Sequence, residues 1–159
     1  EQEHDVVIIT ASGQSIRFGG DRVPSRSRPA GGVRGIKLVG DDLVVGMETV
    51  DLKDRIMVVT EFGHGKLMAM SRYPKQGRGG MGVRAFNVTK KTGSLVDSEL
   101  VKEGVDNEVF IVSANSQVYR TKLDGIPTQG RHSSGVIVWR PGSGDKVASI
   151  ACFQNEDKA

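Results

Sequence analysis

The sequence predicts an all-β fold, a propeller-like array of about three four-stranded antiparallel units. The first observation is a tandem repeat of about 50 residues that runs through nearly the whole 159-residue chain. The second is the composition: 21 glycines, 5% aromatic residues and no segment with helical periodicity suit short strands and tight turns. One such unit cannot bury both faces of its sheet, so we expect neighbouring units to stack.

Each repeat opens with an apolar strand that runs into a turn. These segments are residues 5–14, 54–64 and 108–117. A hydroxyl residue stands at the corresponding place in each segment, at Thr10, Thr60 and Ser113. A basic residue follows each turn, at Arg17, Lys66 and Arg120. The alternation of these features predicts the first two strands of each unit.

The second half of each repeat carries an arginine followed four positions later by a glycine. The three pairs are Arg28 and Gly32, Arg78 and Gly82, and Arg131 and Gly135. Each glycine precedes a predicted third strand, over residues 33–38, 83–88 and 136–139. A last apolar run follows a polar turn, over residues 43–47, 95–101 and 147–153.

The repeats therefore cover about residues 4–52, 53–105 and 106–155 of one partial domain, residues 1–159. Three units are too few to close an ordinary propeller ring. We expect either a piece of a longer array or an open arc with exposed end units. In such an arc Phe62, Phe86, Phe110 and Trp139 are assigned to the core.

A glycine-rich turn at residues 76–83 lies at the centre of a purely basic segment. It reads Gln-Gly-Arg-Gly-Gly-Met-Gly-Val, with Arg78 as its one charge, and no acidic residue occurs between positions 62 and 96. Glycines let the backbone approach a partner closely, and the simplest partner for this charge is a polyanion. The turn also satisfies G-x-G-x-x-G, but no strand precedes it and no helix follows, which argues against dinucleotide binding.

Charge is segregated along the chain although the net charge is only +3. Residues 14–40, 63–91 and 116–141 hold most of the 22 Lys and Arg residues but only two of the 19 acidic ones, Asp21 and Asp124. A solvated face normally mixes signs. This pattern therefore predicts an electropositive band on the surface.

The sequence gives no sign of a membrane span, a signal peptide, or a catalytic or metal site. No apolar run reaches the ~20 residues of a membrane span, and residues 1–5 do not resemble a signal peptide. We therefore expect a soluble cytoplasmic protein in which the single Cys152 packs as a small apolar residue. The three histidines lack metal-ligand spacing, and neither Tyr73 nor Tyr119 lies in a motif for a nucleophile. We predict no catalytic, metal or cofactor site.

The chain resembles the C-terminal domain of the DNA gyrase A subunit over nearly its whole length. The similarity rests on Ser-Gly-Gln-Ser-Ile-Arg-Phe at 12–18, Glu-Phe-Gly-His-Gly-Lys at 61–66 and Tyr-Pro-Lys-Gln-Gly-Arg-Gly-Gly at 73–80. The family's signature, the gyrase A box, is Gln-(Lys/Arg)-Arg-Gly-Gly-(Lys/Arg)-Gly in its first blade. The positions that match it here are Gln76, Arg78, Gly79, Gly80 and Gly82, whereas Gly77 and Met81 replace its other basic residues.

The resemblance implies a β-pinwheel of about six four-stranded blades, of which this chain would be the C-terminal half with a box-like turn in a later blade. It implies wrapping of double-stranded DNA around a basic rim in an ATP-dependent type II topoisomerase that introduces negative supercoils. The chain itself would be non-catalytic. Its partners would be the other gyrase A domains and the gyrase B subunit, with ATP and Mg²⁺ bound in other domains.

On physical grounds the basic loops should contact phosphates, because no recognition helix is predicted and aromatic residues are few. An alternative for Arg34 and Arg84 is a strand-edge charge that blocks aggregation. The predicted contact set is Arg17, Arg26, Arg28, Arg34, Lys37, Lys66, Arg72, Lys75, Arg78, Arg84, Lys90, Lys91, Arg120, Lys122 and Arg131.

Three other interpretations remain open at this point. The paralogous topoisomerase IV subunit carries a similar domain, usually with a more degraded box. A Kelch-like propeller, which also repeats at about 50 residues, would be a protein-binding module. A standalone three-blade scaffold would self-associate to bury its open ends.

Overall fold

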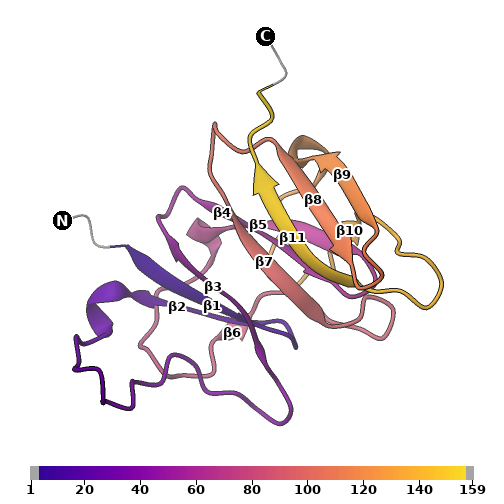
Figure 1. Cartoon of the computed structure of the whole chain (residues 1–159). Coiled ribbons are helices and arrows are strands. Elements are labelled where there is room, and N and C mark those ends of the chain that lie inside the picture. Colours follow the sequence, from indigo (N-terminus) through magenta and orange to yellow (C-terminus); the bar gives the residue numbers. More distant parts are fainter. Residues whose placement is uncertain (1–3, 157–159) are drawn as a thin grey trace.

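The computed structural model describes residues 4–156 and shows three small antiparallel sheets stacked side by side along the chain (Figure 1). The predicted all-β fold is confirmed. The helical turns among the described residues are three single 3₁₀ turns at equivalent places, each just after the second strand of a repeat. These turns are η1 (Gly20–Arg22), η2 (Met70–Arg72) and η3 (Leu123–Gly125).

Each sheet is built mainly from one repeat. The first has the order β3-β1-β2-β6, with β1 (Asp5–Thr10), β2 (Gln14–Gly19), β3 (Val44–Val50) and β6 (Val83–Arg84). The second has the order β10-β5-β4-β7, with β4 (Arg55–Thr60), β5 (His64–Ala69), β7 (Leu95–Val101) and β10 (Val136–Ile137). The third has the order β11-β8-β9, with β8 (Glu108–Ser113), β9 (Val118–Lys122) and β11 (Val147–Phe153).

The fourth strand of a sheet comes from the following repeat. In the first sheet Val83 of β6 lies opposite Ser15 of β2. In the second sheet Val136 of β10 lies opposite Gly65 of β5. The third sheet has no fourth strand within residues 4–156, so the outer edge of β9 is unpaired there. Within residues 4–156, strand exchange therefore links the first repeat to the second and the second to the third.

Glycine is required where the exchanged segment crosses the neighbouring strand. Gly82 has φ +75°, and a Cβ there would collide with the Ser15 carbonyl oxygen. Gly135 has φ +68°, and its Cβ would collide with the Gly65 carbonyl oxygen. L-residues with a side chain rarely adopt such φ values, so both the conformation and the close approach exclude other residues.

The third strands differ most from the sequence prediction. Residues 33–38 pair with no sheet edge within residues 4–156 and form no strand there, and the predicted strands 83–88 and 136–139 shrink to two residues each. The chain leaves the ladder early because the amides of Ala85 and Phe86 both donate to the Gly13 carbonyl of the preceding hairpin turn (2.7 and 3.2 Å). Conversely, the apolar run predicted at 43–47 continues as β3 to Val50.

The core lies between the sheets. One buried cluster joins Val7 and Ile9 of the first sheet to Ile56 and Val58 of the second and to Phe86, which follows β6. A separate cluster joins the second sheet to the third. Stacking of faces, and not closure of one sheet, therefore buries the apolar residues.

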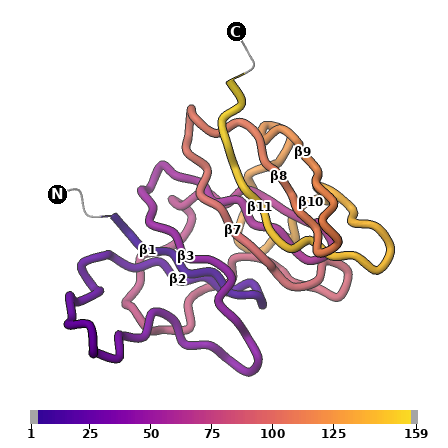
Figure 2. Tube along the Cα trace, in the orientation of Figure 1, coloured from indigo at the N-terminus to yellow at the C-terminus, as the bar shows by residue number. Residues whose placement is uncertain are grey.

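The outermost faces are covered unequally. On the first sheet, Ile36 packs over Ile8, Ile16 and Phe18. It comes from the long connection between β2 and β3, which runs along the lower left of the molecule (Figure 2). On the third sheet, Phe110 is only half-buried. The assignment of Phe86 to the core is confirmed, whereas Phe62 is 38% exposed and that assignment is wrong.

No helix among residues 4–156 is long and apolar enough to cross a membrane. The predicted domain also includes residues 1–3 and 157–159, which lie outside the described residues. The prediction that the N-terminus is not a signal peptide rests partly on residues 1–3.

Candidate nucleic-acid interface

The box-like turn lies along the outer edge of β2 and is held by backbone bonds on both sides. The Gln76 amide donates to the Arg17 carbonyl at 2.7 Å. On the other side, the Gly79 amide donates to the Gly35 carbonyl and the Lys37 amide to the Gly80 carbonyl, both at 2.8 Å. The turn of the second repeat is thus an integral part of the first sheet's edge.

Arg78 is half-buried and clamps the long connection of the first repeat. Its Nε donates to the Arg22 carbonyl at 2.9 Å and its Nη1 to the Arg34 carbonyl at 2.5 Å. These bonds bring Arg22, Arg34 and Arg78 together at one edge of the first sheet. Arg78 therefore has a structural role that the sequence did not predict, and its contact with DNA stays a prediction.

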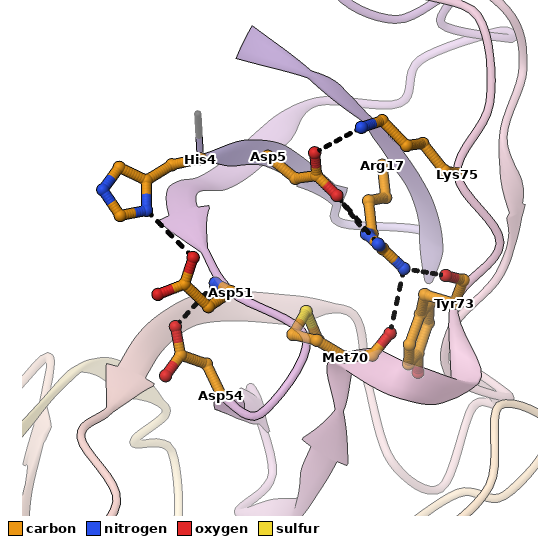
Figure 3. Close-up of polar contacts among 8 residues, drawn as sticks. All are labelled: His4, Asp5, Arg17, Asp51, Asp54, Met70, Tyr73 and Lys75. Carbon is orange, nitrogen blue, oxygen red and sulfur yellow. Dashed lines mark hydrogen bonds and ion pairs between the residues drawn. The ribbon is translucent and has the colours of Figure 1, made fainter. Parts of the chain in front are cut away.

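Arg17 is buried at the junction of the first and second sheets (Figure 3). It forms an ion pair with Asp5 at 2.8 Å, and its Nη1 donates to the carbonyls of Met70 and Tyr73 at 3.3 and 2.6 Å. Lys75 binds the other carboxylate oxygen of Asp5 at 3.0 Å. Burial by itself raises the pKa of Asp5, but the hydrogen bonds and charges of Lys75 and Arg17 outweigh it and hold this pKa below its usual value.

The inclusion of Arg17 among the phosphate contacts is therefore wrong for this fold, because its guanidinium is enclosed between two sheets. Lys75 stays accessible with 57% of its side chain exposed, but its charge is already paired with Asp5.

Lys66 is the second correction, because its side chain is completely buried. Its Nζ donates to the carbonyls of Gly130 and Ser133 at 2.7 and 3.1 Å, and it lies 5.0 Å from the centre of the Phe86 ring. Burial lowers its pKa from 10.5 to about 8. Lys66 anchors the turn of the third repeat to the second sheet and does not reach the surface.

The strand registers explain why the three basic residues that follow the turns are not equivalent. Arg17 lies opposite Val7 and Arg120 opposite Phe110, at the same place in their hairpins. Lys66 lies opposite Val58, one residue closer to the turn. Successive side chains point to opposite faces of a strand, so an offset of one residue reverses the face.

The remaining candidates lie at the surface. Arg120 is accessible but paired with Glu108 at 2.7 Å. Arg84 lies in β6 at the edge of the first sheet, whereas Arg34 lies in no strand within residues 4–156. The exposed candidates are Arg26, Arg28, Arg34, Lys37, Arg72, Lys75, Arg84, Lys90, Lys91, Arg120 and Lys122, and Arg131 is half-buried.

Arg140 is a basic residue that the sequence-based contact set omits. It lines a surface hollow with Phe62, His64, Lys91 and Ile137. Burial, followed by the charges of Lys91 and Arg140, lowers the pKa of His64. His64 is therefore neutral near pH 7, and Lys91 and Arg140 form a local positive centre. Arg140 lies within residues 116–141, the third basic segment of the sequence, and this position could have indicated it as a candidate.

The tyrosines and the cysteine show no arrangement for catalysis. Tyr73 is buried, its hydroxyl donates to the Ala85 carbonyl at 3.4 Å, and burial raises its pKa. Tyr119 stacks on Trp139 with ring centres 5.8 Å apart. Burial, reinforced by nearby carboxylates, raises the pKa of Cys152 to about 12, so its reactive thiolate is scarce. The part of the chain that the structure describes contains no cluster of metal-ligating residues.

Comparison with known proteins agrees with this architecture. The family model described as the DNA gyrase C-terminal domain, a β-propeller, matches residues 4–51, 54–102 and 107–154. The DNA gyrase A subunits of Dehalogenimonas lykanthroporepellens and Haloquadratum walsbyi are each 38% identical over 155 residues, which cover 94% and 96% of this chain. The chain spans only 19% and 18% of those two proteins.

Solved structures show the same relationship. A DNA gyrase A C-terminal domain superimposes with a TM-score of 0.85 at 30% identity and covers 96% of this chain and 51% of that one. The C-terminal domain of a DNA topoisomerase IV superimposes with a TM-score of 0.86 at 22% identity, over 98% of this chain and 48% of that one. The second likeness concerns the fold alone. Because the family model matches all three repeats, the chain belongs to the DNA gyrase C-terminal domain family.

Proposed function

We propose that the chain binds duplex DNA without sequence preference and bends it, as part of the A subunit of a gyrase-type topoisomerase. The observation that carries the proposal is the set of exposed basic side chains that recurs in all three repeats, mostly on loops. Among the residues that the structure describes, most of these side chains form no ion pair. They are Arg26, Arg28, Arg34, Lys37, Arg72, Arg84, Lys90, Lys91 and Lys122.

Unpaired surface cations on a chain with segregated charge attract polyanions, and the release of counterions from DNA then drives binding. Contact through phosphates fits this surface better than contact through bases. The described residues contain no helix that could enter the major groove, and the exposed loops carry few aromatic side chains for base stacking.

Bending follows from the arrangement of the repeats. A duplex that contacts cations on more than one of the stacked sheets would have to follow them and bend. Bending 20–30 bp by 40–90° costs on the order of 1–6 kcal/mol, which several phosphate contacts can offset. In the whole protein this contact would support DNA wrapping and negative supercoiling in the bacterial cytoplasm.

The parent enzyme in this proposal is an ATP-dependent type II topoisomerase, with gyrase B as its partner subunit and with ATP and Mg²⁺ bound outside this chain. Identities of 38% to gyrase A subunits favour gyrase over topoisomerase IV, whose domain is 22% identical. The family match likewise favours a DNA-binding role over a Kelch-like protein-binding module.

The test is fluorescence anisotropy with two ~40 bp duplexes of unrelated sequence across a salt series. The double variant Lys90→Gln/Lys91→Gln removes two adjacent exposed charges from one turn. Both duplexes should bind it equally more weakly, and the slope of log K against log salt should become shallower by up to about 2, since each phosphate contact contributes about 0.9.

The matched control is Lys102→Gln, which removes an exposed lysine outside the basic windows. It should leave both affinity and slope unchanged. Binding of the unsubstituted chain to neither duplex at low salt would overturn the proposal, and so would equal losses in the double variant and the control.

A further inference from the structure

We propose that the surface hollow beside His64 holds one phosphate group of the DNA backbone, and that His64 takes up a proton when the phosphate binds. This inference rests on the proposed function and adds a pH-dependent contact to it. The hollow lies on the second sheet and is lined by Phe62, His64, Lys91, Ile137 and Arg140. The first and third sheets pack on either side of the second, so both neighbours of the hollow are described.

Three segments that are far apart in the sequence build the hollow. The first is the turn that leads into β5 at His64. The second carries Arg140 and follows β10, and the amides of Val138 and Trp139 fix it by donating to the Gly63 carbonyl at 2.8 and 3.3 Å. A Cβ on Gly63 would collide with the Trp139 carbonyl oxygen, so the two segments can approach this closely only at a glycine.

The third segment is the polar turn that carries Lys91. Thr89 and Thr92 close this turn, because the amide of each donates to the hydroxyl oxygen of the other at 3.0 and 3.2 Å. The Phe62 amide donates to the Thr92 carbonyl at 3.2 Å and fixes the turn beside the hairpin. Backbone hydrogen bonds therefore place Lys91 and Arg140 around the same hollow.

The hollow gathers positive charge that no carboxylate neutralises within residues 4–156. Lys91 and Arg140 are both exposed and form no ion pair there. The other charged side chains of the adjoining turns are the exposed Lys90 and the pair of Glu61 and Lys146, whose charged atoms lie 3.3 Å apart. An anion that enters the hollow therefore meets two cations without a competing partner.

His64 is the titratable group of the hollow. Burial, and then the charges of Lys91 and Arg140, lower its pKa, so the ring is neutral near pH 7. A phosphate between these cations would bring a negative charge beside the ring and favour the imidazolium. The proton comes from solvent and binds a ring nitrogen, which can then donate a charge-assisted hydrogen bond to a phosphate oxygen.

The size and the walls of the hollow fit one phosphate group. Its volume is about 100 Å³, below the ~150 Å³ of a cavity that accepts benzene, so it has no room for a whole base. Phe62 and Ile137, which are 38% and 42% exposed, form its apolar part. Apolar walls keep water away and strengthen the attraction between the charges inside.

The equivalent place between the first and second repeats differs in its chemistry. By the registers of β6 and β10, Gln14 takes the place of His64 and Asn87 the place of Arg140. A cation is present there too, at Arg84, but neither amide side chain can take up a proton near neutral pH. The chain itself therefore supplies the substitutions that test the site, His64→Gln and Arg140→Asn.

The first test measures the affinity for one ~40 bp duplex between pH 6 and pH 8 at constant ionic strength. The affinity of the unsubstituted chain relative to that of His64→Gln should fall as the pH rises, by up to about tenfold per pH unit for one proton. Titration of His4, His132 and Lys66 is common to both proteins and cancels in this ratio.

The outcomes separate this inference from the proposed function. A ratio that stays constant with pH, in chains that do bind the duplex, would overturn the proton uptake and leave DNA binding standing. Failure of the unsubstituted chain to bind at all would overturn both. The matched control is His132→Gln, which removes an exposed histidine outside the hollow and should keep the full pH dependence. Loss of the dependence in this control alone would assign the proton to His132.

An NMR titration of the His64 ring tests the site without relying on affinity. Arg140→Asn should raise the pKa of His64 in the free chain, because one of the two repelling charges is removed. Saturating duplex should raise it in the unsubstituted chain, and sodium sulfate at matched ionic strength should raise it less. An unchanged pKa with duplex would overturn the proposal. An equal rise with sulfate would assign the hollow to free oxyanions and overturn the DNA backbone as its ligand.

Discussion

Arg17 and Arg120 occupy the same place in two repeats, but the first side chain is buried and the second is exposed. Each lies in the second strand of its sheet and pairs with a carboxylate of the first strand, Asp5 or Glu108. Arg17 has 8% of its side chain exposed and binds two carbonyls of the next repeat. Arg120 has 44% exposed. The difference within residues 4–156 is that a sheet packs after the first repeat and none packs after the third.

In the third sheet, aromatic side chains lie around the exposed arginine. The rings of Phe110 and Phe153 stack with centres 4.6 Å apart, and the Arg120 guanidinium lies 5.9 and 5.3 Å from their centres. Cation–π contacts at exposed sites contribute about 0.5–1 kcal/mol each. The same arginine–carboxylate pair is therefore buried where a neighbouring repeat packs against it and exposed where none does.

The largest expected effect comes from removing the buried arginine. Arg17→Met leaves the Asp5 carboxylate and two carbonyls without their main partner, so we expect a loss of about 3–5 kcal/mol in the free energy of unfolding. Arg120→Met, at the exposed equivalent, should cost less than about 1 kcal/mol. Urea denaturation of the two variants measures the contrast, and equal losses would contradict it.

The second largest effect is expected at Lys66, which is buried like Arg17 but has no carboxylate among its contacts. Lys66→Met should lower the free energy of unfolding by about 1–3 kcal/mol at pH 7, because the carbonyls of Gly130 and Ser133 lose a donor. Removal of a desolvated charge offsets part of this loss.

The pH dependence of the Lys66 effect has a definite sign. The folded-state pKa of Lys66 is about 8 and the unfolded value 10.5, so between these values the unfolded chain holds more protons and stability rises with pH. The gap between the unsubstituted chain and Lys66→Met should therefore widen from pH 8 to pH 10. The raised pKa of Cys152 lowers the stability of both proteins in this range and cancels in the difference. A constant gap would show that Lys66 titrates normally.

The smallest expected effect concerns Glu48, on β3 beside β7. Burial, and then the charge of Asp97, raises its pKa, so the ionised form at pH 7 disfavours folding. Glu48→Gln should stabilise the chain by less than about 1 kcal/mol at pH 7. The advantage should vanish as the pH falls towards 4 and Glu48 becomes protonated. Thermal unfolding at both pH values tests this, and a stabilisation independent of pH would contradict it.

The sequence predicts the repeat, the β class and the turn glycines well, because strand alternation and positive-φ turns leave local signatures. It predicts the third strands poorly. Residues 33–38 and 83–88 carry similar patterns, but only Val83–Arg84 pairs, because pairing depends on an edge offered by another repeat. The phosphate contacts of the exposed cations stay predictions.

By itself, the sequence determined that this chain is a tandem β array with segregated positive charge, since periodicity and composition are local properties. Only the tertiary structure decided which cations are available. A register offset of one residue buries Lys66, and a neighbouring sheet buries Arg17 while Arg120 stays exposed. The physical reason is that burial of a charge depends on surfaces brought together from distant repeats, which no single stretch of sequence records.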